Sequence, residues 1–160
     1  METPESHSPV LAALRRFLLV ILVLSLLATG TELLLVGHTE DAWQWAPLVL
    51  IGLGLATALW LAAAPSPAAL RAWQSLMGLL ILSGLTGFCL HGAAKMEFTR
   101  ESNPAAGEWS ILWASLKTQS PPTLAPAVLI QTALLGLAYA FRHPALRRTA
   151  RNKSAVTGEE

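Results

Sequence analysis

Four long apolar runs constrain the fold of this chain more than any other feature. They cover residues 17–36, 46–64, 72–91 and 124–141, and Glu32 is the only charged side chain inside them. About 20 residues at a rise of 1.5 Å cross the roughly 30 Å of hydrocarbon in a bilayer. Backbone polar groups in lipid must be satisfied within the segment, so each run is expected to be a helix. The sequence therefore predicts an all-α bundle of four transmembrane helices.

Composition supports one membrane domain and argues against a soluble globule. Only 13% of residues are charged and 53% are hydrophobic, against about 25% charged in an average soluble domain. We expect a polar head at 1–16, a transmembrane domain at 17–141 with an outer loop at 92–123, and a basic, disordered tail at 142–160. A net charge of +1 gives no reason to expect a nucleic-acid partner, and the single Cys89 allows no disulfide within the chain.

The first run could also be read as a secretory signal, because Arg15 and Arg16 precede it. A cleavable signal would end near the small residues at 28–30, but the apolar run resumes at Leu33. A retained helix is the preferred interpretation.

The basic residues predict the orientation, since loops rich in Lys and Arg stay in the cytoplasm. Eight of them fall on one side of the predicted spans, at Arg15, Arg16, Arg71, Arg142, Arg147, Arg148, Arg151 and Lys153. Three fall on the other side, at Lys95, Arg100 and Lys117. Both termini are thus expected in the cytoplasm. The Ala, Leu and Arg-rich composition suggests a bacterial inner membrane, with the loops at 37–45 and 92–123 in the periplasm.

Local signals mark the helix ends. Pro47 and Pro126 are placed in the first turns of the second and fourth helices, residues 65–67 should end the second helix, and Asp41 and Thr123 are candidate caps. Aromatic rings near the helix ends are expected at the lipid headgroups; they are Trp43, Trp45, Trp60, Trp73, Tyr139 and Phe141.

The outer loop contains an amphipathic pattern. Its apolar residues recur at i, i+3, i+4 and i+7, at Trp109, Leu112, Trp113 and Leu116. This spacing predicts a short helix with one apolar face. The face either anchors the loop on the membrane or over the mouth of the bundle, or it is an interaction surface for another protein.

Polar residues near the outer ends of the helices are candidates for binding a ligand or ion. An ionisable side chain such as Glu32 is costly in lipid unless it is paired, hydrated or neutral. Glu32 has three possible roles. It could lock helix packing as a protonated or hydrogen-bonded side chain, carry a proton, ion or substrate, or extend its carboxylate to the membrane surface. The candidate set is Glu32, His38, Glu40, Asp41, His91 and Gln131.

A divalent metal site is a further hypothesis, with His38, His91, Glu97 and Glu101 as ligands. Imidazole and carboxylate suit zinc, copper or iron, but a site needs three or four converging ligands. The alternative is a hydrated rim, with Lys95 or Arg100 paired to Glu97 or Glu101. Haem is disfavoured because the histidines lie at helix ends, and no cofactor is predicted.

Small residues line the predicted helices, at Gly52, Gly54, Ala56, Gly78, Gly84, Gly87, Ala133 and Gly136. In membranes such residues let helices approach closely. They indicate packing within the bundle or, alternatively, an interface with another subunit.

Two stretches, residues 32–41 and residues 124–144, resemble segments of small bacterial four-span membrane proteins. The resemblance implies a four-helix fold and groups Glu32, His38, Glu40 and Asp41. No activity is attached to those proteins, so it implies no catalytic residue.

The sequence favours a non-enzymatic accessory or structural subunit of a membrane complex. Its expected partners are the lipid bilayer and another membrane protein or a second copy. No catalytic residue is assigned, because the chain has no nucleophile motif, phosphate loop or paired intramembrane aspartates. Binding or transport of a small solute, proton or metal ion by the outer Glu/His cluster is the alternative, and a membrane enzyme using a metal at this rim is a third hypothesis.

Overall fold

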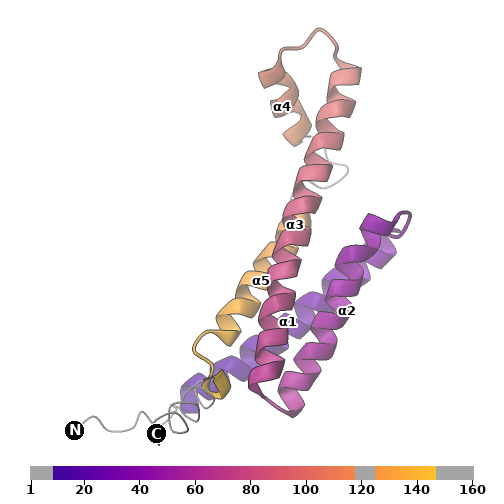
Figure 1. Ribbon diagram of the computed structural model, residues 1–160. Coiled ribbons are helices and arrows are strands. Elements are labelled where there is room, and N and C mark those ends of the chain that lie inside the picture. The colour runs from indigo at the N-terminus through magenta and orange to yellow at the C-terminus, as the bar shows by residue number, and fades with distance from the viewer. Residues whose placement is uncertain (1–8, 118–124, 147–160) are drawn as a thin grey trace, which may run out of the picture.

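The computed structural model describes residues 9–117 and 125–146, and all regular secondary structure in these ranges is helical. The helices are α1 (Pro9–Leu35), α2 (Ala42–Ala63), α3 (Pro67–Ser102), α4 (Glu108–Lys117) and α5 (Ala125–Ala140). Figure 1 shows α3 as the longest element, with α4 folded back beside its far end. The expectation of an all-helical fold is confirmed.

Three of the described helices, α1, α2 and α3, are long and apolar enough to cross a membrane, while α5 is a shorter apolar helix. The chain is therefore compatible with a multi-pass integral membrane protein. Four spans and the location of the termini remain predictions. The expected cap Thr123 and most of the basic tail lie outside the described residues.

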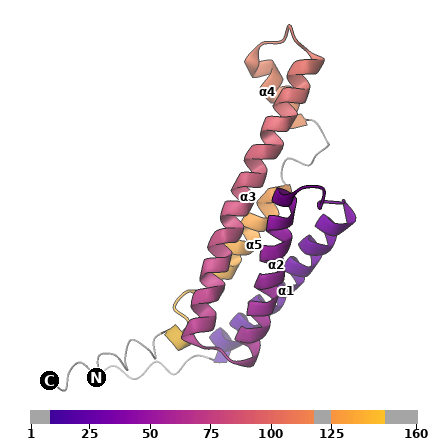
Figure 2. The same ribbon diagram turned by 45° about the vertical axis from the view of Figure 1, so that its right-hand side comes forward.

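Helices α1, α2, α3 and α5 form a bundle, and α4 packs beside α3. Helix α2 packs against α1 and α3, and α5 packs against α1 and α3. The start of α1, the α2–α3 connection and the end of α5 lie at one end, as both views show (Figures 1 and 2). We call this the basic end, because Arg15, Arg71 and Arg142 lie there. The opposite end, with the α1–α2 turn and α4, is the hairpin end.

The turn between α1 and α2 is fixed by two local motifs. Gly37 has a positive φ of 70°, and the His38 N–H donates to the Leu33 carbonyl while the Gly37 N–H donates to Leu34. This is a Schellman ending, which needs a left-handed residue that glycine adopts most readily. The Asp41 carboxylate then accepts from the N–H groups of Trp43 and Gln44. The capping role expected for Asp41 is confirmed.

Helices α1 and α2 begin earlier than the apolar runs suggested. Helix α1 starts at Pro9 rather than near 17, since residues 10–14 are good helix formers and proline suits a first turn. Because α2 starts at Ala42, Pro47 lies inside the helix. The prediction that Pro47 lies in the first turn was therefore wrong. At its observed position the proline leaves the Trp43 carbonyl without the usual helical N–H donor.

The connection between α2 and α3 ends one helix and starts the next. Helix α2 stops at Ala63, and the Ala64 N–H still donates to Trp60. The Ser66 hydroxyl accepts from the Ala69 N–H, with Pro67 in the first turn of α3. Residues 65–67 thus end the helix as expected, because proline cannot continue it and serine caps the next one.

The core contains buried residues of α1, α2, α3 and α5, and its largest buried side chain lies where α3 crosses α5 near the basic end. Trp73 is fully buried, and its indole N–H donates to the Gly136 carbonyl at 2.7 Å. A Cβ on Gly136 would collide with Met77, and one on Gly84 would lie 2.9 Å from the Pro126 carbonyl. These two glycines let α3 and α5 approach closely. By contrast, a Cβ on Gly52 or Gly78 would meet nothing within 4 Å.

Trp73 and Tyr139 correct the expectation that rings near helix ends lie at the headgroups. They are 0% and 5% exposed and meet edge to face, with centroids 6.1 Å apart. Burial and the indole hydrogen bond hold these rings in the core. Trp43 and Phe141 are exposed, as a position at the headgroups requires.

Helix α3 continues well beyond His91, where the third apolar run ends. Residues 92–102, expected in a loop, add three turns to it. They are mostly strong helix formers, and the helix stops only before Asn103 and Pro104. Its 36 residues measure about 54 Å, against roughly 30 Å of hydrocarbon. The outer connection is therefore largely a helical hairpin, which we define as residues 92–117.

Candidate functional site

The hairpin end brings together two of the predicted ligand residues. The Schellman turn at Gly37 places His38 directly after α1, and His91 projects from α3. Their ring centroids are 6.2 Å apart, with planes inclined by 44°. Both side chains are partly exposed. This contact joins the α1–α2 turn to α3, whereas α1 itself packs mainly on α2 and α5.

The other predicted ligand residues are placed on the outside of the bundle. Glu32 and Gln131 are exposed, as are Glu40 and Asp41, and the Asp41 carboxylate is engaged as the cap of α2. In residues 9–117 and 125–146, no three His, Cys, Asp or Glu side chains gather in a group that could hold a metal ion. The buried polar side chains of the described part are different ones, among them Thr57 and Thr132.

Glu97 and Glu101, proposed as metal ligands with the two histidines, lie on the exposed surface of the extended part of α3. Arg100, expected to pair with one of them, instead donates to both carboxylate oxygens of Glu108 at 3.1 and 2.9 Å. The reason is that α4 folds back along α3 and brings Glu108 beside Arg100. This is the salt bridge found among the described residues.

The hairpin has its own small interior, which the apolar pattern of the sequence did not predict. Thr99 and Ile111 are buried where α3 and α4 meet. Lys95 lies one turn before Thr99 on α3, and Ser115 lies one turn after Ile111 on α4, and both are also buried. The Thr99 hydroxyl donates to the Lys95 carbonyl and the Ser115 hydroxyl to the Leu112 carbonyl. The available signal was the i, i+4 spacing of Lys95 with Thr99 and of Ile111 with Ser115, which puts each pair on one helical face.

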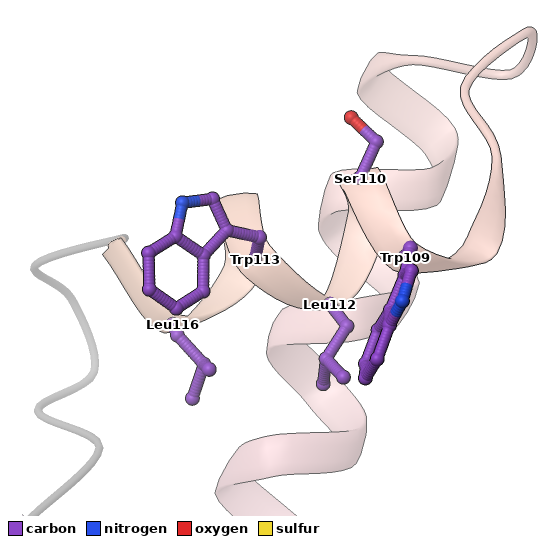
Figure 3. A pocket seen from close by; sticks show the side chains of 5 residues that line it. All are labelled: Trp109, Ser110, Leu112, Trp113 and Leu116. Atoms are coloured by element: carbon purple, nitrogen blue, oxygen red, sulfur yellow. The ribbon is translucent and has the colours of Figure 1, made fainter.

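The opposite face of α4 carries the predicted interaction surface. Trp109 is 81% exposed and Trp113 63%. Together with Ser110, Leu112 and Leu116 they line a shallow, open hollow. Figure 3 shows the indole of Trp109 beside Leu112 and that of Trp113 beside Leu116, with Ser110 directed away from them. The ammonium of Lys117 lies 5.2 Å from the Trp113 ring.

Helix α4 is predicted correctly as a short amphipathic helix, but it does not cover the bundle mouth. Among the described helices it contacts only α3, and both views place it beyond the α1–α2 turn (Figures 1 and 2). Its apolar face is thus left open by the rest of the described chain. We refer to Trp109, Leu112, Trp113 and Leu116 as the α4 face.

The basic end holds a second polar cluster. Arg15 donates to the Arg142 carbonyl at 3.3 Å, and the rings of Tyr139 and His143 are 5.6 Å apart. Burial lowers the pKa of His143 below its usual value of 6.5, and the nearby Arg15 charge lowers it further. A neutral imidazole is favoured there, and His143 Nδ1 accepts from the Ala145 N–H at 3.3 Å. The cluster closes the bundle where α1 meets the end of α5.

The fold and both ends define the class as a helical protein with membrane-capable helices and a helical hairpin beyond them. Comparison of the chain with protein-family models, curated proteins and solved structures found no match. The assignment of a role therefore depends on the geometry described above.

Proposed function

We propose that this chain is a four-span protein of a bacterial inner membrane, with both termini in the cytoplasm, and that it acts as a non-enzymatic accessory subunit of a membrane complex. The orientation is supported by the gathering of Arg15, Arg71 and Arg142 at one end of the bundle. Helix α5 supports a fourth span, because it is an apolar helix without charged side chains and packs along α3.

The open α4 face is the observation that carries the proposal. Large exposed apolar side chains in water are unfavourable unless something covers them, and tryptophan is enriched at the centres of protein interfaces. We infer that the occupant is the extramembrane surface of a partner membrane protein, carrying an apolar patch flanked by basic side chains.

The height of the hairpin favours a protein over lipid headgroups as this occupant. From His91 to Ser102, α3 rises about 16 Å. The headgroup layer is only about 5–7 Å thick on each side. Because α4 runs back along α3, its Trp109 end is the part farthest from the apolar run, and a rise of about 16 Å would place that end beyond the headgroups. The Leu116 end returns toward the apolar run.

The charges of the hairpin favour basic flanks on the partner. Glu97 and Glu101 are exposed, and neither forms an ion pair within the described residues, because Arg100 forms its salt bridge with Glu108. Their carboxylates are available to Lys or Arg of a partner, which would steer association more than it would add affinity.

Photo-crosslinking in native membranes tests the proposal. A photoreactive residue at position 113 is expected to give one discrete protein adduct. The adduct should weaken strongly with Trp109→Ala and with the pair Glu97→Lys and Glu101→Lys. The matched control places the same probe at Leu82, an exposed position on the apolar part of α3, where lipid adducts are expected. Lipid adducts alone from position 113, or a protein adduct unchanged by these substitutions, would overturn the proposal.

Binding or transport by the outer Glu/His cluster is the second candidate function. One observation favours it, the approach of His38 to His91. The exposure of Glu32 and Gln131 leaves them outside the bundle interior. Replacing Glu32 with Gln should abolish binding or transport if this carboxylate takes part, and an unchanged variant would remove it from the site.

A further inference from the structure

We propose that His38 and His91 form a two-histidine site for a divalent transition-metal ion, which ties the α1–α2 turn to α3. The two side chains come from separate segments, and the fold alone brings them together. The left-handed Gly37 and the hydrogen bond from the His38 N–H to Leu33 fix where the chain leaves α1. His91 is held on the continuous helix α3.

The distance between the rings suits a shared metal ion. A metal lies about 2.0–2.1 Å from an imidazole nitrogen, which puts it about 3 Å from the ring centre. Two imidazoles on one ion therefore have centres about 5–6 Å apart, depending on the angle at the metal. The observed separation is 6.2 Å. Rotation of the two partly exposed side chains would turn one nitrogen of each ring toward the ion.

The donor set predicts which metal binds and how tightly. No third His, Cys, Asp or Glu joins the pair in the described residues, so Glu97 and Glu101 are not part of this site. The remaining coordination positions would be filled by water. Without a cage to impose geometry, affinity should follow the general order for divalent ions, in which Cu²⁺ binds most tightly and Ni²⁺ and Zn²⁺ less so.

Neighbouring charges oppose each other at this site. Lys95 lies one turn beyond His91 on α3, and its positive charge disfavours a cation. Glu40 and Asp41 follow His38 in the turn, and their negative charges favour a bound cation, although the Asp41 carboxylate also caps α2. Two neutral ligands and one opposing charge predict a weaker site than a three-ligand zinc centre.

Metal binding should have a structural consequence that a simple ring contact lacks. Helix α1 packs mainly on α2 and α5, and α2 packs on both α1 and α3, so the α1–α2 turn is linked to α3 chiefly through α2. An ion shared by His38 and His91 would cross-link the turn to α3. Because the site exists only in the folded protein, the ion should raise the unfolding temperature as its concentration exceeds the dissociation constant.

Calorimetric titration of the full-length protein in mild detergent with Cu²⁺, and separately with Ni²⁺, tests the inference. We expect one ion per chain, a rise in the unfolding temperature, and Cu²⁺ electron paramagnetic resonance showing two imidazole nitrogens. His38→Ala and His91→Ala should each weaken binding at least tenfold and remove the thermal shift. The matched control is His143→Ala, which changes a partly buried histidine at the opposite end of the bundle.

Binding that survives in His38→Ala or His91→Ala, or that is lost equally in His143→Ala, would overturn the inference. So would the absence of a stoichiometric ion in the unaltered protein. Circular dichroism and gel filtration without metal show whether each variant keeps its fold, and Gln at either position serves where Ala does not. The site and the α4 face lie on different segments, so failure of one proposal leaves the other standing.

Discussion

Helix α3 is continuous, but its two parts, Pro67–His91 and Gly92–Ser102, differ in charge and in their neighbours. From Pro67 to His91 it carries only the single charge of Arg71 and packs against α2 and α5, with Trp73 and Met77 fully buried. From Gly92 to Ser102 it carries four charged side chains, and α4 packs beside this end of the helix. The first part is apolar and long enough to cross about 30 Å of hydrocarbon. The second part extends past the α1–α2 turn (Figures 1 and 2).

The comparison shows that a helix and a membrane span are separate properties. The span ends where apolar side chains end, because lipid excludes charge. The helix ends where backbone propensity ends, at Asn103 and Pro104. Because residues 92–102 satisfy the second condition and not the first, the bundle presents a hairpin beyond its apolar part.

Replacing Trp73 with Ala is expected to have the largest effect, because it opens a cavity in the bundle half and leaves the Gly136 carbonyl without its indole donor. The loss should be about 3–5 kcal/mol in the free energy of unfolding. Trp60→Ala, which removes a half-exposed ring from α2, should cost within about 0.5 kcal/mol. Unfolding midpoints in SDS mixed micelles measure both. Equal losses would mean that the α3–α5 crossing is not the core.

Replacing Ile111 with Ala should lower the stability of the hairpin alone. Ile111 is 2% exposed and packs where α4 meets α3. Its truncation should cost about 2 kcal/mol of local stability. Hydrogen exchange is expected to speed up at the amides of α4 and not at those of α2. Leu116→Ala, on the exposed face of the same helix, is the control and should change neither. Faster exchange throughout the bundle would show that the two halves unfold together.

The smallest effect is expected from the titration of His143 at the basic end. Because burial and Arg15 lower its pKa in the folded protein, the unfolded chain binds the proton more readily. The stabilisation is therefore complete above pH 6.5 and is lost as the pH falls through the lower pKa of the folded state. His143→Asn should flatten the pH dependence of unfolding between pH 7.5 and pH 5. An unchanged slope would contradict a lowered pKa, which NMR titration of the imidazole measures directly.

The sequence could predict features that depend on neighbouring residues. The apolar runs, the Asp41 cap, the stop at residues 65–67 and the amphipathic α4 all follow from local spacing and propensity. The start of α1 at Pro9 and the extension of α3 to Ser102 were missed, because hydrophobicity was used to place helix ends. Propensity at residues 10–14 and 92–102 would have predicted both.

Site geometry could be predicted only in part. His38 and His91 were expected on the same rim, but their 6.2 Å separation depends on the turn at Gly37 and on the packing of α2 between α1 and α3. The pairing of Arg100 with Glu108 rather than with Glu97 or Glu101 depends on α4 folding back. Trp73 and Tyr139 have the same sequence context as the exposed rings, so their burial was not visible in the pattern.

The sequence by itself determined that this chain is helical and that its apolar runs are long enough to cross a bilayer, because runs of that length favour helices that satisfy their own backbone groups. It also fixed the caps and turns, whose hydrogen bonds join residues a few positions apart. Only the tertiary structure decided which glycines pack within the bundle, which two histidines meet, and that residues 9–107 and 125–146 leave the α4 face open. Those outcomes depend on the distances between helices, which arise from close packing of side chains far apart in the chain.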